Sequence, residues 1–158
     1  MGPKWLFFPA TSEAPTLGYI TVSSAQVASV YENPASYAID GNTSTYWREV
    51  LRYSQYWTAV FSSPRIIKRL EIYCSGVIGG GFPPSNYSPK YFYIQGSNNN
   101  SDWTNLTSEV HLTWTTAAWQ NVEFTDNTTA YQYYRILFTA SQGSTAGLVE
   151  VKAYGVTN

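Results

Sequence analysis

The sequence contains a single cysteine and a single histidine among 158 residues. With only Cys74 present, an internal disulfide is excluded, and the apolar run "LEIYCSG" predicts that this thiol is a small buried hydrophobe. His111 lies in an apparent strand with no acidic or nucleophilic neighbour at a suggestive spacing, and no G-x-S-x-G, phosphate-binding loop or H-E-x-x-H motif occurs. The carboxylates are few and mostly stand at strand edges, so we expect a protein that is not an enzyme.

Charge is also scarce. Charged residues make up 12% of the chain, with 9 basic and 10 acidic side chains, so no basic surface for nucleic acid or for an anionic membrane is indicated. No apolar run is long enough to insert into a membrane, and the first residues lack the pattern of a signal peptide. Aromatic residues make up 17%, which predicts a core packed from large rings.

Short runs of alternating apolar residues, separated by Gly, Pro, Asn and Ser, recur along the whole chain. A period of two is typical of strands with one buried face, and seven such runs predict one all-β domain, an antiparallel β-sandwich. Only residues 24–31 and 44–53 are compatible with a short helix. We expect a long loop over 76–89 and a polar hairpin over 96–103. The predicted strands cover residues 19–24, 56–63, 66–74, 90–97, 119–125, 133–141 and 148–155.

The stretch "AIDGNTSTYW", residues 38–47, combines an Asp-Gly turn with three hydroxyls and two aromatic rings. A hard cation such as Ca²⁺ takes six to eight oxygen ligands, and Asp40, Gly41, Asn42 and Thr45 are spaced to wrap one. The same residues also suit an Asp-Gly turn capped by threonine without a metal. These residues alone leave both interpretations open.

Four segments together carry a resemblance to a known family. "SYAIDGNTSTYW" is similar to the A-x-D-G-x-x-x-T-x-W signature of discoidin domains, also called coagulation factor V/VIII type C domains, and of family 32 carbohydrate-binding modules. "RIIKRLEIYC" resembles their central strand, and "KYFYIQGSNNNSDWTNL" their F-x-I hairpin. "YQYYRILFTASQGSTAGLVEVKAYG" resembles their closing strands, so the resemblance covers residues 18–155.

The resemblance implies a jelly-roll-like, galactose-binding-type β-sandwich without catalytic activity, which binds its ligand with loops at one end. It also implies a structural Ca²⁺, with Trp47 in the core beneath the loop. The implied metal ligands are the carboxylates of Asp40 and Glu150, the hydroxyl and carbonyl of Thr45, and the carbonyls of Tyr37, Asn42 and Val149. The other tryptophans, Trp57, Trp103, Trp114 and Trp119, are likewise expected to be structural.

Sugar recognition requires a flat apolar ring and a few fixed polar groups. Arg48 occupies the position of the family's histidine and Asn86 lies near its asparagine, whereas the family's arginine and last aromatic are missing. These departures argue against galactose itself but not against carbohydrate binding, and the expected partner is a glycan of galactose or N-acetylhexosamine type. The candidate polar contacts are Glu32, Arg48, Arg52 and Asn86, and the candidate stacking rings are Tyr53, Phe82 and Tyr87. Each also has a structural alternative, such as a local ion pair of the arginines.

We expect residues 17–158 to form a lectin-like module and residues 1–16 an N-terminal extension. The predicted function is to attach a larger multidomain or multimeric protein to a glycan, in an extracellular, cell-surface or virion-associated setting. Two alternatives remain: an adhesion module for protein or phospholipid head groups, and a ligand-free structural module of a virion.

Overall fold

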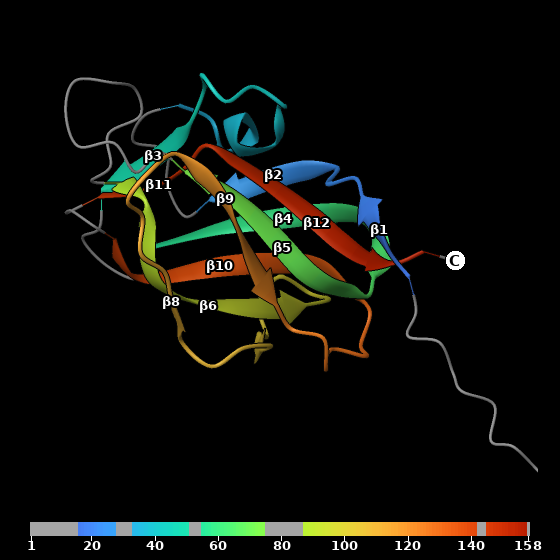
Figure 1. Ribbon diagram of the computed structural model, residues 1–158. Helices are drawn as coiled ribbons and strands as arrows, with labels where there is room; N and C mark the ends of the chain where they lie inside the picture. Colours follow the sequence, from blue (N-terminus) through green and yellow to red (C-terminus); the bar gives the residue numbers. More distant parts are fainter. Residues whose placement is uncertain (1–15, 28–32, 51–54, 75–86, 142–144, 158) are drawn as a thin grey trace, which may run out of the picture.

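The computed structural model describes residues 16–27, 33–50, 55–74, 87–141 and 145–157 (Figure 1). These residues form strands and one short 3₁₀ helix, η1 (Ala35–Ile39). No helix in these ranges is both long and apolar enough to cross a membrane. The strands are β1 (Leu17–Ile20), β2 (Ser24–Val27), β3 (Trp47–Val50), β4 (Gln55–Arg65), β5 (Ile67–Cys74), β6 (Pro89–Ser97), β7 (Thr104–Asn105), β8 (Val110–His111), β9 (Ala118–Glu123), β10 (Tyr131–Ser141), β11 (Thr145–Leu148) and β12 (Glu150–Val156).

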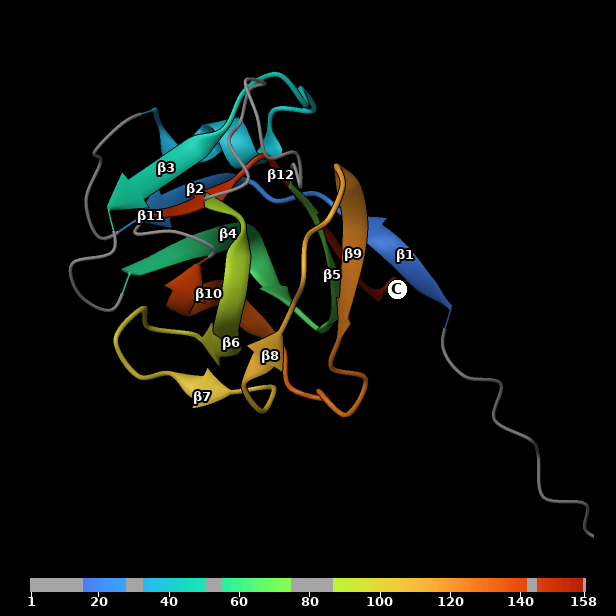
Figure 2. The same cartoon turned by 60° about the vertical axis from the view of Figure 1, so that its left-hand side comes forward.

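Two antiparallel sheets face each other and form a β-sandwich, as the alternation predicts (Figure 2). The smaller sheet has the strand order β1-β12-β5-β9. The larger has the order β2-β4-β10-β6-β7, with β8 paired to β6. A two-stranded sheet of β3 and β11 lies at one end, and β1 and the end of β12 lie at the other (Figure 1).

The space between the sheets is filled by aromatic and branched side chains. On β10, Tyr134, Ile136 and Phe138 are buried, as the period of two predicts. Trp47 is also fully buried, with its ring 5.9 Å from that of Phe138. Cys74 is buried as well, and burial raises the pKa of its thiol to about 12, so the expectation of an inert, packed cysteine is confirmed.

Two local expectations were wrong. Residues 24–27 and 47–50 form strands, and the helical turn lies at residues 35–39 instead. β2 pairs with β4, and β3 pairs with β11, which supplies the backbone hydrogen bonds that a helix would otherwise provide. Pairing with distant strands therefore outweighed the local pattern. The expected hairpin at 96–103 is confirmed, whereas residues 1–15 and most of the long loop lie outside the described residues.

One buried hydroxyl connects β10 to the turn between β4 and β5. Tyr134 Oη donates to the carbonyl of Arg65 at 2.6 Å and accepts from the backbone N–H of Ile67 at 3.1 Å. The side-chain amide of Asn127 donates to Tyr134 Oη at 3.2 Å and to the carbonyl of Ile67 at 2.8 Å. Burial raises the pKa of Tyr134, so its hydroxyl remains protonated and able to donate.

Tyr134→Phe is expected to lower the free energy of unfolding by about 1–3 kcal/mol, because it leaves buried backbone groups without their partner. Chemical denaturation measures the change. Tyr133→Phe, on the outer face of the same strand, is the matched control and should change stability by less than about 0.5 kcal/mol. Equal effects of the two variants would contradict a structural role for the Tyr134 hydroxyl.

Candidate functional site

The Asp-Gly loop, residues 40–45, follows η1 and is closed by its own side chains. Asp40 Oδ1 accepts from the backbone N–H of Asn42 at 2.8 Å. Thr45 Oγ1 lies 2.7 Å from Asp40 Oδ2 and 2.8 Å from the carbonyl oxygen of Asn42. Gly41 has φ +77°, a left-handed conformation that side chains rarely adopt. This geometry gathers three oxygen atoms from Asp40, Asn42 and Thr45 on one side of the loop.

Glu150, the first residue of β12, joins this loop from 109 positions further along the chain. Its Oε1 accepts from the backbone N–H of Gly41 at 2.8 Å and from that of Asn42 at 3.2 Å. Only 3% of Glu150 is exposed. The structure therefore brings Asp40 and Glu150 together, as the family signature implies.

The two carboxyl groups have opposite pKa shifts. Burial, followed by hydrogen bonding to Asp40, raises the pKa of Glu150 to about 7. For Asp40, partial burial alone would raise the pKa, but the hydrogen bonds from Thr45 and Asn42 outweigh it and the pKa is lowered. At neutral pH the loop thus holds one firmly ionised carboxylate and a second one that is costly to ionise.

This donor set fits a hard cation. Carboxylate, hydroxyl and carbonyl oxygens are the ligands Ca²⁺ prefers, and a cation between Asp40 and Glu150 would relieve their repulsion. Tyr37 lies in η1 just before the loop, and Val149 directly precedes Glu150, so the chain positions of both expected carbonyl ligands are adjacent to it. In the described ranges, no three His, Cys, Asp or Glu side chains form a metal-binding group, so neutral oxygens must complete any coordination shell.

A second group of side chains, the Arg48 cluster, consists of Tyr46, Arg48 and Tyr87. Arg48 Nη1 donates to Tyr87 Oη, and the guanidinium carbon lies 4.7 Å from the centre of the Tyr87 ring. The rings of Tyr46 and Tyr87 stack at 6.5 Å with an angle of 26°. Burial raises the pKa of Tyr46, partly offset by a hydrogen bond from Asn33. The cluster combines flat rings with a fixed cation.

Strand alternation explains how the cluster forms. Trp47 points into the core, so the next residue of β3, Arg48, lies on the opposite side of the strand, while Tyr46, directly before β3, is buried with 6% of its surface exposed. Gly147, opposite Arg48 on β11, allows Tyr87 to approach, because a Cβ there would lie 3.0 Å from the Cβ of Tyr87 and 2.9 Å from the Trp47 carbonyl oxygen. Arg48 and Tyr87 were predicted from the sequence. Tyr46 was missed, because its ring contact with Tyr87 depends on the fold and not on the local pattern.

The other predicted ligand contacts, Glu32, Arg52, Tyr53, Phe82 and Asn86, lie outside the described residues. Trp57 and Trp114 are buried and Trp103 is half-buried, as expected. Trp119 differs, because it is 38% exposed on the outer face of the smaller sheet beside Tyr73.

His111 is exposed, as a solvated strand histidine should be. Its Nε2 lies 3.0 Å from a carboxylate oxygen of Glu109, which in turn accepts from the hydroxyl of Thr139 at 2.6 Å. This partner was not expected from the sequence. The Glu109 carboxylate thus contacts both His111 and Thr139, and the three side chains form a hydrogen-bond network at the protein surface.

The antiparallel β-sandwich, with its early Asp-Gly loop held by a glutamate on the closing strand, has the features that the resemblance to discoidin domains implies. The model of the F5/8 type C domain matches residues 19–151, and the chain belongs to this family. No curated protein matches the sequence.

Solved structures of similar fold include several family 32 carbohydrate-binding modules. The module of NanJ from Clostridium perfringens, in complex with galactose, is 22% identical, with a TM-score of 0.69 and coverage of 88% of this chain and 99% of that one. The module of AlyQ, in complex with 4,5-unsaturated mannuronic acid, is 18% identical over 86% of this chain and 97% of that one, with a TM-score of 0.69. A third, from C. perfringens in complex with GalNAc-β-1,3-galactose, is 17% identical over 86% and 99%, with a TM-score of 0.70. At these identities, the likeness establishes the fold.

The raised pKa of Glu150 predicts an unusual pH dependence in the presence of a chelator. Because the pKa of Glu150 is about 7 in the folded protein and its ordinary value is 4.5, the folded protein binds this proton more tightly, and stability should fall as pH rises through that interval. Thermal melts with EDTA at pH 5 and pH 8 measure the difference. Glu150→Gln should reduce it, whereas an unchanged difference in that variant would contradict the assignment.

Proposed function

We propose that the chain is a non-catalytic carbohydrate-binding module whose sugar site includes the Arg48 cluster. The observation that carries the proposal is the Arg48 guanidinium fixed by hydrogen bond and stacking on Tyr87, beside the Tyr46 ring. An aromatic ring suits the C–H face of a pyranose, and a guanidinium supplies several donors for hydroxyl oxygens. Galactose or an N-acetylhexosamine is the proposed ligand type.

Family membership and the sugars bound to the solved modules support this proposal. Those modules are described in complex with galactose, a GalNAc-galactose disaccharide and an unsaturated mannuronic acid. Of the residues proposed for ligand contact, Arg48 and Tyr87 are both in the described part of the chain and contact each other. Sugar sites of this kind bury little surface, so weak affinity for one sugar and reliance on multivalency are part of the proposal.

A Ca²⁺ held by the Asp-Gly loop is the second part of the proposal. The residues proposed to hold it are Asp40, Thr45 and Glu150, with carbonyls of Tyr37, Asn42 and Val149. Its role is structural, because Thr45 directly precedes Tyr46 and Trp47, the first residue of β3. Fixing the loop therefore restricts Tyr46 and the start of the strand that carries Arg48.

The wider role we propose is attachment of a larger extracellular, cell-surface or virion-associated protein to glycans. A solved AlyQ chain that combines a family 32 module with alginate lyase domains supports a multidomain setting, since this chain covers 34% of it. Binding is directed to sugar without membrane insertion.

Arg48→Ala is expected to weaken binding on a glycan array by at least about tenfold, because it removes charge-assisted donors and the support of Tyr87. Arg69→Ala is the matched control. Arg69 also lies over a tyrosine ring, at 4.3 Å from Tyr154, but on the outer face of the smaller sheet. Equal array signals for the two variants, or binding to liposomes and to no glycan, would overturn the sugar-binding proposal.

Calcium binding is tested separately by thermal shift. CaCl₂ added to chelated protein is expected to raise Tm, because a ligand that binds only the folded state stabilises it. Asp40→Asn should abolish the increase, whereas Asp126→Asn, in an exposed turn, should retain it. A Tm that does not respond to Ca²⁺ in the unaltered protein would refute the structural metal while leaving the sugar site to be judged by the array.

A further inference from the structure

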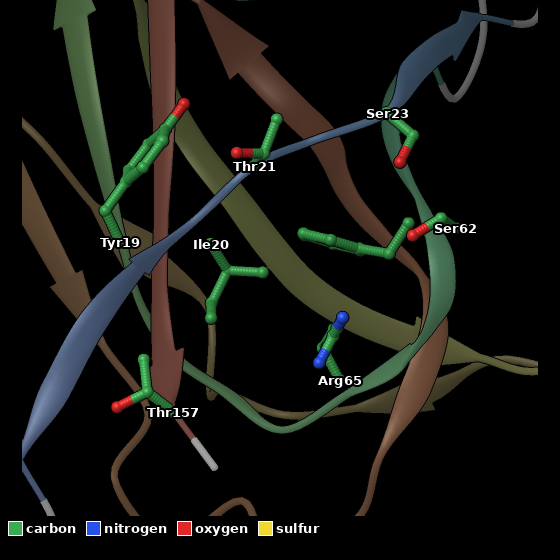
Figure 3. A pocket seen from close by; sticks show the side chains of 8 residues that line it. Tyr19, Ile20, Thr21, Ser23, Ser62, Arg65 and Thr157 are labelled. Atoms are coloured by element: carbon green, nitrogen blue, oxygen red, sulfur yellow. The ribbon is translucent and has the colours of Figure 1, made fainter.

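A cavity of about 490 Å³, here called the terminal pocket, opens at the end of the sandwich where β1 and β12 meet the end of β4. Its volume is in the range of roughly 300–1,000 Å³ that is typical of small-molecule sites. Figure 3 shows Ser62 and Arg65 of β4 facing the β1 segment across it, with Thr157 at the rim. The lining residues are Tyr19, Ile20, Thr21, Ser23, Phe61, Ser62, Arg65 and Thr157.

The terminal pocket is separate from the proposed sugar site. β4 begins at Gln55, opposite Phe138, and ends at Arg65, opposite Tyr131. The Arg48 cluster lies at the Gln55 end. Arg48 of β3 pairs with Gly147 of β11, and the Gly147 carbonyl accepts a hydrogen bond from the thiol of Cys74, the last residue of β5. The pocket residue of β4 nearest to Gln55 is Phe61, six residues away, so roughly 20 Å of strand at 3.3 Å per residue separates that end from the pocket.

The lining has the chemistry of an anion site. Among the described residues that form it, Arg65 is the one charged side chain and no carboxylate is present. In the part of the chain that the structure describes, the Arg65 guanidinium makes no ion pair or hydrogen bond, so its donors are available. Guanidinium groups bind carboxylates with two parallel hydrogen bonds, a geometry that fixes the orientation of the ligand.

Hydroxyl groups surround this cation. Thr21, Ser23, Ser62 and Thr157 are all exposed at the pocket. Hydroxyls both donate and accept, so they can match the mixed donors and acceptors of a polyhydroxylated ligand. An inorganic anion would bind to Arg65, but most of these hydroxyls would then remain hydrogen-bonded to water.

The pocket also offers apolar surface in two places. Ile20 of β1 points into the pocket, whereas the ring of Tyr19 rests edge-on against Tyr154 at 5.9 Å on the outer face of the smaller sheet (Figure 3). Phe61 is buried and forms apolar lining. Apolar lining beside hydroxyls and a cation suits the C–H face of a pyranose that carries a carboxylate.

The framework of the pocket is rigid. Tyr19 and Ile20 pair with β12, and the backbone N–H of Ser23 donates to the carbonyl of Val60 at 2.8 Å. The carbonyl of Arg65 accepts the hydrogen bond from Tyr134 described above. The arginine therefore projects from backbone that is held by the core network, and ligand binding need not order a loop.

We propose that the terminal pocket is a second ligand site, specific for an acidic sugar unit whose carboxylate pairs with Arg65 and whose hydroxyls contact the surrounding Ser and Thr side chains. The module then has two ends that bind sugar independently: a neutral sugar at the Arg48 cluster and a uronic acid at the terminal pocket. Two sites on one rigid body can bridge two chains or two points on one polysaccharide.

The test is a titration of the ¹⁵N-labelled full chain with methyl β-D-glucuronide, followed by amide chemical shifts. Saturable shifts are expected at Thr21, Ser23 and Ser62, with affinity weakened by salt as for other charge-assisted contacts. Methyl β-D-glucoside, which lacks the carboxylate, should bind at least about tenfold more weakly. Arg65→Ala should reduce the glucuronide affinity by a similar factor.

Two variants separate this site from the first one. Arg48→Ala should leave the affinity for the glucuronide unchanged. Arg69→Ala, which removes an arginine outside the pocket lining, should also leave it unchanged. Arg65→Lys tests the paired hydrogen bonds and should bind more weakly than the unaltered protein. Three results would each overturn the proposal. These are chemical-shift changes confined to the Arg48 cluster, equal affinity for the glucoside and the glucuronide, and equal affinity for glucose 6-sulfate and the glucuronide.

Discussion

The end of the sandwich that carries β3 depends on one contact, between the Glu150 carboxylate and the backbone N–H groups of Gly41 and Asn42. It joins a loop near residue 40 to the first residue of the closing strand. The position of Glu150 is itself determined by pairing of β12 with β5, where it lies opposite Tyr73. A local turn is thereby attached to the hydrogen-bonded framework, and the following strand β3 starts from a defined place.

The cost of this contact is electrostatic. Glu150 is buried next to Asp40, so its ionisation is opposed and its pKa rises to about 7. Two backbone N–H groups compensate in part, and a cation among the loop oxygens would compensate further. The arrangement thus gives a physical reason for the proposed metal: it allows both carboxylates to be charged while the loop remains folded.

Some of these features follow from local sequence and others do not. The strands of the core were predicted because alternation of apolar residues needs no knowledge of partners, as Tyr134, Ile136 and Phe138 illustrate. Residues 24–27 and 47–50 were misjudged because their strand state depends on β4 and β11. Trp119 was misjudged because the pairing of β9 with β5 decides which face of β9 meets the core. The proximity of Asp40 and Glu150 was expected only through the family signature.

The sequence by itself determined an all-β chain with an aromatic core, a single unpaired cysteine and an Asp-Gly turn, because composition, period and turn chemistry act over a few residues. Only the tertiary structure decided that Tyr46 and Tyr87 stack beside Arg48 and that Arg65 faces a hydroxyl-lined pocket. These groups lie on strands and turns far apart in the chain. Their encounter depends on sheet order and register, which long-range pairing sets.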